Sequence, residues 1–367
     1  MEYALSELFT LQMGKTPSRD NSSYWGKSEN SWISIADLTN SGKYISNTKE
    51  TLSDSAVAES GIKKIPANTV IMSFKLSLGK VAITEKEMYS NEAIMAFIDK
   101  GVEKISPEYL YYLLRAKDWS KGTNKAVMGA TLNKATLSTI KIQLHEYDNQ
   151  LEIVNMLNRV SSSIDFRKQQ LTKLDELIKA RFVEMFGDPI ANSVGWEEVQ
   201  LSGCLESIDN GKSYVCDTSC RKGESPAILK LSAVTYGDYR PDENKAMLDE
   251  AYFSKDITVQ SGDLLFTRKN TPELVGMCAY VYKTPANLML PDLIFRLNTK
   301  PLCNKIYLWK LINHELFRKQ IQALSSGSAK SMSNISKERL LHLSVILPPL
   351  SLQNQFAAFV AEVDKSK

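Results

Sequence analysis

Hydrophobic residues recur every seven positions near the middle of the chain. One series consists of Leu157, Ile164, Leu171, Ile178 and Met185, and its companion series consists of Ile153, Val160, Arg167, Leu174 and Arg181. Such paired heptad positions are typical of a coiled-coil seam. Because the stretch 149–186 lacks glycine and proline, it predicts one helix on the order of 55 Å long. Such a helix would act as a spacer between the N-terminal and C-terminal parts of the chain. The sequence Gly187-Asp188-Pro189 then ends this helix.

The remainder of the chain consists of two divergent copies of one unit, because the same order of signals returns about 195 to 203 residues later. Gly14-Lys15 returns as Gly211-Lys212. Apolar residues then alternate with polar ones over 33–38 and over 229–234, and this period of two predicts strands.

The later parts of the two copies also correspond. Each has a buried strand that leads to a basic residue (65–75 and 259–269), a glycine that opens a β-rich run (81–83 and 279–281), a short helix (107–116 and 304–316) and a final amphipathic segment (132–142 and 335–345). The recurrence predicts that both copies share one fold while their surfaces differ.

The end of the second copy resembles the start of the long helix. Phe356, Val360 and Val363 align with the first residues of the heptad seam. They predict a second, truncated helix that packs on the first. The helix-interface residues are then Ile153, Leu157, Val160, Ile164, Leu171, Leu174, Ile178, Met185, Phe356, Val360 and Val363. If the two helices pack antiparallel, the seam around 153–164 stays uncovered, and we expect it to be met by a second copy of the chain, a C-terminal fragment or a modification subunit.

These signals predict an α+β protein with two duplicated α/β lobes separated by long, coiled-coil-like spacer helices, the second helix truncated. The expected boundaries are 1–147 for the first lobe, 148–190 for the central helix and its end, 191–347 for the second lobe and 348–367 for the second helix.

Composition excludes several protein classes. The 367 residues are 43% hydrophobic and 24% charged, values typical of globular proteins and unlike those of disordered or collagen-like chains. Because the sequence shows neither a long apolar run nor a signal peptide, we expect a cytoplasmic protein. The formal net charge of +3 does not by itself identify a nucleic-acid binder.

Metal and catalytic motifs are incomplete. Cys216 and Cys220 lack a second ligand pair at zinc-site spacing, so we expect no metal. Gly14-Lys15-Thr16 lacks the earlier glycine of a phosphate-binding loop, and Leu347-Pro348-Pro349-Leu350 lacks the polar and aromatic residues of an adenine methyltransferase. The acidic residues and lysine of a nuclease site are confined to one turn, 241–245. We therefore expect a non-catalytic chain without a cofactor of its own.

Basic and hydroxyl residues recur at strand ends and loops in both copies. In the first copy they are Lys15, Thr16, Ser18, Ser73, Lys75, Lys80, Thr131 and Lys134. In the second copy they are Lys212, Lys230, Thr267, Arg268, Lys269, Ser328, Lys330 and Lys337. Such side chains suit phosphate contacts and base-edge hydrogen bonds. For any single lysine a solvated surface charge is favoured by roughly two to one, so the prediction of a DNA-binding surface rests on the recurrence.

Three motifs carry a family resemblance. Gly14-Lys-Thr-Pro-Ser18 with Trp32-Ile-Ser-Ile-Ala-Asp-Leu38 resembles the opening of a target-recognition domain in the specificity (S) subunit of type I restriction-modification systems. The segments 174–189 and 347–355 resemble the end of that family's central helix and the entry into its second one. The second copy departs from the pattern at 211–215.

The resemblance implies that each lobe reads one half of a bipartite double-stranded DNA site and that the two long helices pack antiparallel. It also implies that modification (methyltransferase) and restriction (endonuclease/translocase) subunits dock on the helices, and that S-adenosylmethionine, ATP and Mg²⁺ belong to those partners. The alternatives are a divergent nuclease or restriction-methylation enzyme and a protein-binding adaptor. A steep salt dependence of DNA binding would distinguish a DNA reader from an adaptor.

Overall fold

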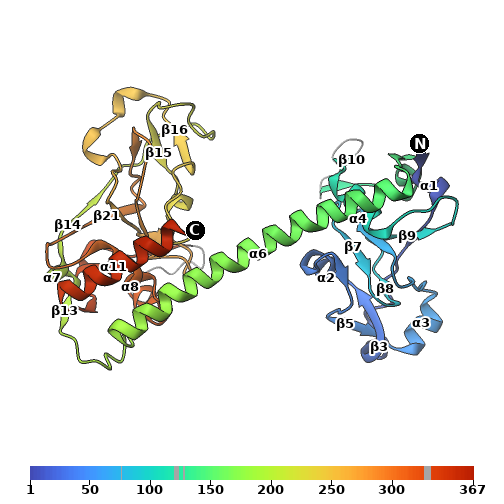
Figure 1. Cartoon of the computed structure of the whole chain (residues 1–367), viewed down its shortest axis with the longest axis horizontal. Helices are drawn as coiled ribbons and strands as arrows, with labels where there is room; N and C mark the ends of the chain where they lie inside the picture. The colour runs from blue at the N-terminus through green and yellow to red at the C-terminus, as the bar shows by residue number, and fades with distance from the viewer. Residues whose placement is uncertain (76, 120–123, 127–128, 326–331) are drawn as a thin grey trace. The chain divides into compact units, whose positions relative to one another are not determined.

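Figure 1 shows the computed structural model, which describes residues 1–75, 77–119, 124–126, 129–325 and 332–367. The chain divides into two compact units, Met1–Phe166 and Arg167–Lys367. Within the described residues, no helix combines the length and the hydropathy that crossing a lipid bilayer requires.

The first unit is built on a five-stranded sheet and a three-stranded sheet. The larger sheet has the order β2 (Phe9–Met13), β9 (Ile94–Asp99), β6 (Val70–Ser73), β7 (Val81–Thr84) and β4 (Tyr44–Ile45). The smaller sheet has the order β5 (Glu50–Leu52), β3 (Trp25–Ile33) and β8 (Tyr89–Ser90). Strands β6 and β7 are buried along their whole length, which explains their continuous apolar sequences.

The second unit repeats this arrangement. Its larger sheet has the order β14 (Leu205–Asn210), β21 (Ile294–Thr299), β17 (Leu264–Thr267) and β19 (Cys278–Tyr280). Its smaller sheet has the order β16 (Asn244–Ala246), β15 (Ala227–Leu229) and β20 (Leu288–Met289). These strands have the same chain order and the same neighbours as their counterparts in the first unit, and among the described residues β4 is the one strand of the first unit's two sheets without a counterpart here. The duplication inferred from the sequence is therefore confirmed.

Short helices and strand pairs surround the sheets in both units. The first unit has α1 (Leu5–Leu8), α2 (Ile35–Asn40), α3 (Asp54–Ser60), α4 (Pro107–Ala116), α5 (Lys134–Thr139), the strand pair β1 (Glu2–Ala4) and β12 (Lys141–Gln143), and the pair β10 (Asn124–Ala126) and β11 (Gly129–Thr131). The second unit has α7 (Leu201–Cys204), α8 (Lys305–Asn313), α9 (Glu315–Ala323), α10 (Lys337–Leu341), the pair β13 (Glu198–Gln200) and β23 (Ser344–Ile346), and the pair β18 (Lys269–Asn270) and β22 (Ser333–Asn334). Helix α4 packs on β7 and α8 on β19, so both predicted short helices cover equivalent strands.

The strand predicted over 33–38 is wrong beyond Ile33. Helix α2 begins directly after β3, because the Ser34 side chain accepts a hydrogen bond from the Asp37 backbone N–H and the Asp37 carboxylate accepts one from the Ser34 N–H. This reciprocal cap stabilises a helix start. The second copy likewise turns from β15 into the 3-10 helix Leu231–Ala233.

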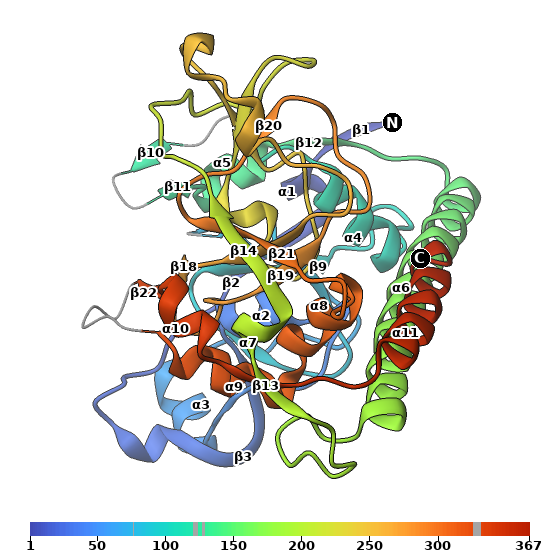
Figure 2. The same cartoon turned by 90° about the vertical axis from the view of Figure 1, so that its left-hand side faces the viewer.

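The long helix α6 spans Tyr147–Phe186, 40 residues, as the heptad pattern predicts. Helix α11 (Leu350–Lys365) packs on its C-terminal part in the second unit, and Figure 2 shows the two side by side. The Phe356 ring lies 5.5 Å from that of Phe182 and 5.4 Å from that of Phe186, whereas Lys367 Nζ donates to Asp175 Oδ1 at 2.6 Å. The start of α11 thus lies at the end of α6, and the predicted antiparallel pairing is confirmed.

Burial along the predicted seam is uneven. Ile178, Phe356, Val360 and Val363 are buried, and Leu174 and Met185 pack at the edge of the same core. Leu157, Val160, Ile164 and Leu171 are exposed, as expected for a seam without a covering helix. Ile153 is the exception, because it packs against Tyr109, Leu144 and Val154 in the first unit.

Candidate nucleic-acid interface

Two equivalent glycines begin the loops on which the predicted interface depends. A Cβ on Gly14 would lie 2.2 Å from the carbonyl oxygens of Ser90 and Asn91, and a Cβ on Gly211 would lie 1.6 Å from the carbonyl oxygen of Leu290. Only glycine allows the backbone to approach the neighbouring chain this closely. The recurrence of Gly-Lys in the two copies therefore reflects the same backbone contact beside β8 and β20.

The loop after Gly14 is held by two tryptophans of β3. Trp32 Nε1 donates to the Lys15 carbonyl oxygen at 3.1 Å, and Trp25 Nε1 donates to the Ser18 carbonyl oxygen at 3.0 Å. The Lys15 ammonium donates to the Ser60 carbonyl oxygen and the Thr16 hydroxyl donates to Glu92. Lys15 and Thr16 are thus engaged with the protein, whereas Ser18 is exposed.

Arg19 lies in the same loop and was missed by the sequence analysis. Its Nη1 and Nη2 donate to the two carboxylate oxygens of Glu50 at 2.7 and 3.0 Å, and its guanidinium carbon lies 3.6 Å from the Trp25 ring centroid. The hydrogen bonds from Arg19 lower the pKa of the Glu50 carboxyl and raise that of the guanidinium. An arginine close to two tryptophans is the one signal in the sequence that indicates this cluster.

Ser73 and Thr267 are corrections to the predicted interface. They end the equivalent strands β6 and β17, and both are fully buried. The Ser73 hydroxyl donates to the Ser77 carbonyl oxygen and accepts from the Lys80 N–H, and the Thr267 hydroxyl accepts from the Met277 N–H at 2.9 Å. Each hydroxyl closes the loop that follows its strand, so neither can reach DNA.

The other predicted residues of the first unit lie nearer the surface. Lys75 is half-buried with its ammonium 5.3 Å from the Phe74 ring centroid, Lys80 is exposed, and Lys134 is exposed in the first turn of α5. Thr131 is the last residue of β11, and the structure describes its backbone but not its side chain. The structure leaves the prediction for Lys75, Lys80 and Lys134 open to experiment.

In the second unit, Lys230 lines a cavity of about 420 Å³. Lys212 is exposed, and Lys230 lines the cavity together with Tyr214 and Lys245. The Tyr214 ring stacks on Tyr252 at a centroid distance of 5.5 Å. Aromatic faces beside lysines suit contacts with a nucleic acid, because the rings can pack against sugars and bases while the lysines meet phosphates.

The other basic residues of the second unit that were predicted to contact DNA, and that the structure describes, have partners inside the fold. Arg268 Nη1 lies 3.2 Å from Asp292 Oδ1, and Lys269 Nζ lies 3.7 Å from the other oxygen of the same carboxylate. Lys337 Nζ donates to the Ile208 carbonyl oxygen at 2.7 Å. Ser328 and Lys330 lie outside the described residues. These contacts favour a structural role for Arg268, Lys269 and Lys337 beside any contact with DNA.

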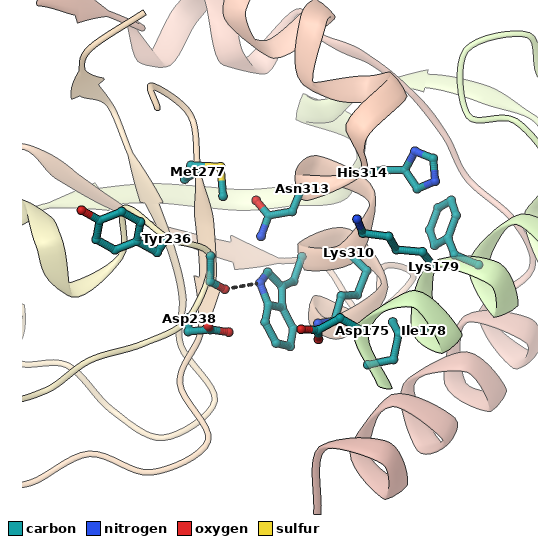
Figure 3. Close-up of a pocket in the computed structure, with 12 residues that line it drawn as sticks. Asp175, Ile178, Lys179, Tyr236, Asp238, Met277, Lys310, Asn313 and His314 are labelled. Atoms are coloured by element: carbon teal, nitrogen blue, oxygen red, sulfur yellow. Dashed lines mark hydrogen bonds between the residues drawn. The ribbon is translucent and has the colours of Figure 1, made fainter. Parts of the chain in front are cut away.

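A second cavity, of about 340 Å³, lies in the second unit between the end of α6, α8 and the loop 236–238 (Figure 3). Trp309 Nε1 donates to the Gly237 carbonyl oxygen at 3.1 Å, the hydrogen bond drawn in that view. Burial lowers the pKa of Lys310 to about 8, and its Nζ lies 3.4 Å from the Trp309 ring centroid. The Trp309 contact ties α8 to the neighbouring loop, so we assign this cavity a structural role.

Metal-ligating groups do not converge anywhere in the described part of the chain. There, no cluster of three or more histidine, cysteine, aspartate or glutamate side chains could hold an ion.

Comparison with known families decides what the duplicated lobes are. The family model described as the type I restriction modification DNA specificity domain matches residues 1–176 and again residues 193–367. The chain belongs to this family. The two specificity domains correspond to the two structural repeats, and each includes one of the glycine-anchored loops.

Curated specificity subunits resemble parts of the chain. The EcoEI specificity subunit of Escherichia coli is 30% identical over 196 residues, which are 52% of this chain and 33% of that protein. The MjaIX specificity subunit of Methanocaldococcus jannaschii is 27% identical over 219 residues, 54% of this chain and 50% of that protein. The chain thus spans between a third and a half of these relatives.

Two solved structures share the fold of this specificity-domain chain. An S subunit of a type I restriction-modification system from M. genitalium is 11% identical with a TM-score of 0.57, covering 100% of this chain and 89% of that one. A chain from a type I system studied for complex assembly and conformational transition is 16% identical with a TM-score of 0.54, covering 100% and 90%. At these identities the likeness supports the two-domain architecture alone.

Proposed function

We propose that this chain is the sequence-specific DNA-recognition subunit of a type I restriction-modification complex, in which each domain reads one half of a bipartite site. The observation that carries the proposal is the duplication itself. The same sheets and the same glycine-anchored loop occur twice, but the loops present different side chains: Arg19 on Trp25 in one and Tyr214 on Tyr252 in the other. One scaffold with two different reading surfaces suits a site with two different halves.

The proposal assigns positioning and reading to different residues. Exposed lysines such as Lys80, Lys134 and Lys212 would contact phosphates and set the register on the duplex. The loop side chains would contact base edges and supply sequence preference. The chain itself would be non-catalytic, and S-adenosylmethionine, ATP and Mg²⁺ would be bound by the partner subunits.

The exposed apolar residues of α6 support a docking role for that helix. Met156, Leu157, Val160, Ile164 and Phe166 are all exposed within the first unit. Apolar side chains gathered along one helix are unfavourable in water and indicate a covering partner. The modification and restriction subunits of the complex would dock along this helix, and a second copy or a C-terminal fragment of a specificity subunit is the alternative.

A salt titration of DNA binding by the full chain tests the proposal. We expect the logarithm of the binding constant to fall steeply with the logarithm of salt concentration, with a slope of about −0.9 for each phosphate that the protein neutralises. A salt-insensitive interaction, or no binding to duplex DNA, would instead favour a protein-binding adaptor. Cleavage of the duplex by the chain alone with Mg²⁺ would favour the nuclease alternative.

A further inference from the structure

Arg19 is placed by three neighbours on one face of the small sheet in the first unit. Trp32 and Glu50 are directly opposed in the register of β3 and β5, so their side chains share that face. The Arg19 guanidinium lies across both, with its carbon 5.1 Å from the Trp32 ring centroid and 3.6 Å from that of Trp25. The two rings meet edge to face at 5.0 Å. The guanidinium is therefore fixed before any ligand arrives.

Among the residues that the structure describes, the contacts of Arg19 leave one edge of its guanidinium available. An arginine has five N–H donors, and Glu50 accepts one from each terminal nitrogen. The edge formed by Nε and the neighbouring terminal nitrogen still carries two parallel donors. Stacking on Trp25 occupies the face of the guanidinium and not its edges, and the Arg19 side chain is 50% exposed. A planar pair of acceptors could reach this edge from solvent.

We propose that Arg19 is a specificity-determining residue that reads a guanine in the half-site of the first domain. The inference rests on the proposed function and names the base. Guanine presents O6 and N7 as paired acceptors in the major groove, and two parallel N–H groups of an arginine match them. A phosphate also accepts two parallel hydrogen bonds from an arginine, but a phosphate contact carries no preference for a base, so a binding selection distinguishes the two ligands.

Arg268 of the second domain shows what an occupied arginine looks like. Its Nη1 pairs with Asp292 at 3.2 Å, its Nε donates to Asn334 Oδ1 at 3.4 Å, and its side chain is only 21% exposed. Both the end and the Nε edge of that guanidinium are engaged by the protein. Arg19 combines a carboxylate at its end with an accessible edge, and this combination distinguishes a reading arginine from a structural one.

Arg19 could instead only tie its loop to the sheet, and the experiment separates the two roles. The full-length chain is incubated with a pool of 40-base-pair duplexes carrying a randomised window, and the bound duplexes are sequenced. Arg19→Lys keeps the positive charge but cannot donate to O6 and N7 from one rigid edge. Lys64→Ala, which removes the exposed ion pair with Glu87 in the same unit, is the matched control.

We expect the wild-type chain and Lys64→Ala to enrich the same bipartite motif, with a required guanine in one half. Arg19→Lys should lose the preference at that position alone. The ratio of its affinity for the guanine-containing duplex to its affinity for a duplex with that base pair changed should be roughly 5- to 150-fold smaller than the wild-type ratio. A melting temperature of Arg19→Lys close to that of the wild type would show that the domain still folds.

Each other outcome contradicts a different statement. If the wild-type chain enriches no motif, the proposed function fails. If the wild type enriches a motif that Arg19→Lys keeps in full, the assignment of Arg19 is wrong. If Arg19→Lys weakens binding to all duplexes alike at an unchanged melting temperature, Arg19 contacts a phosphate and does not read a base. If it lowers the melting temperature together with all binding, Arg19 ties the loop in place and does not read a base.

Discussion

Replacing Phe356 tests the packing of the two helices in the second unit. Its side chain is fully buried, and its ring packs edge to face against both Phe182 and Phe186. A buried phenylalanine replaced by alanine loses its transfer free energy and leaves a cavity, at a cost of about 3–5 kcal/mol. Phe356→Ala also removes two aromatic pairs, which stabilise the fold beyond the burial of apolar area. We therefore expect its cost in free energy of unfolding to lie at the upper end of that range.

The matched control is Leu350→Ala on the same helix, because Leu350 is 40% exposed and its replacement should change stability by no more than about 0.5 kcal/mol. For a unit of this size, about 3–5 kcal/mol corresponds to a decrease in melting temperature of roughly 6–20 °C. Differential scanning calorimetry measures it, with the transition of the first unit as an internal reference. Equal melting temperatures for the two variants would refute the packing of Phe356 between the rings of α6.

Four further predictions concern recognition and electrostatics. Exchanging residues 1–147 for the first domain of another family member should change one half of the methylated motif and leave the other half intact, as methylome sequencing would show; a change in both halves would contradict separate reading by the two domains. Lys75→Ala and Lys269→Ala should each lower the salt slope of DNA binding by about one, and unchanged slopes would mean that neither lysine contacts a phosphate. Ser73→Ala should lower the free energy of unfolding by about 1–3 kcal/mol while leaving that slope unchanged, because it removes a buried loop-closing hydroxyl; a changed slope would return Ser73 to the interface. Burial lowers the pKa of Lys310 to about 8. Between about pH 8 and the ordinary lysine pKa near 10.4, the unfolded chain therefore binds a proton that the folded chain lacks, and the free energy of unfolding should rise with pH across that window. Denaturant titrations at several pH values should show a smaller rise for Lys310→Met than for the wild type.

Elements with local or repeated signals could be predicted from the sequence. A heptad series without glycine or proline predicts α6 with a start within two residues of Tyr147, and recurrence of glycine, strand and helix signals predicts two copies of one fold. These signals suffice because a helix satisfies its hydrogen bonds within one segment. The prediction of a strand beyond Ile33 is wrong because a second local signal competes there. The Ser34–Asp37 cap starts a helix and outweighs a short apolar alternation.

Only the tertiary structure shows which of the polar residues are buried and which keep hydrogen-bond donors accessible to a ligand. Ser73 and Thr267 have the residue types and strand-end positions of DNA contacts, but their burial depends on loops that fold back over them. Arg19 gains its role from Glu50, which lies 31 residues further along the chain and faces it only through the pairing of β3 with β5. Strand register brings together residues that are distant in the sequence, and periodicity within one segment carries no record of that register.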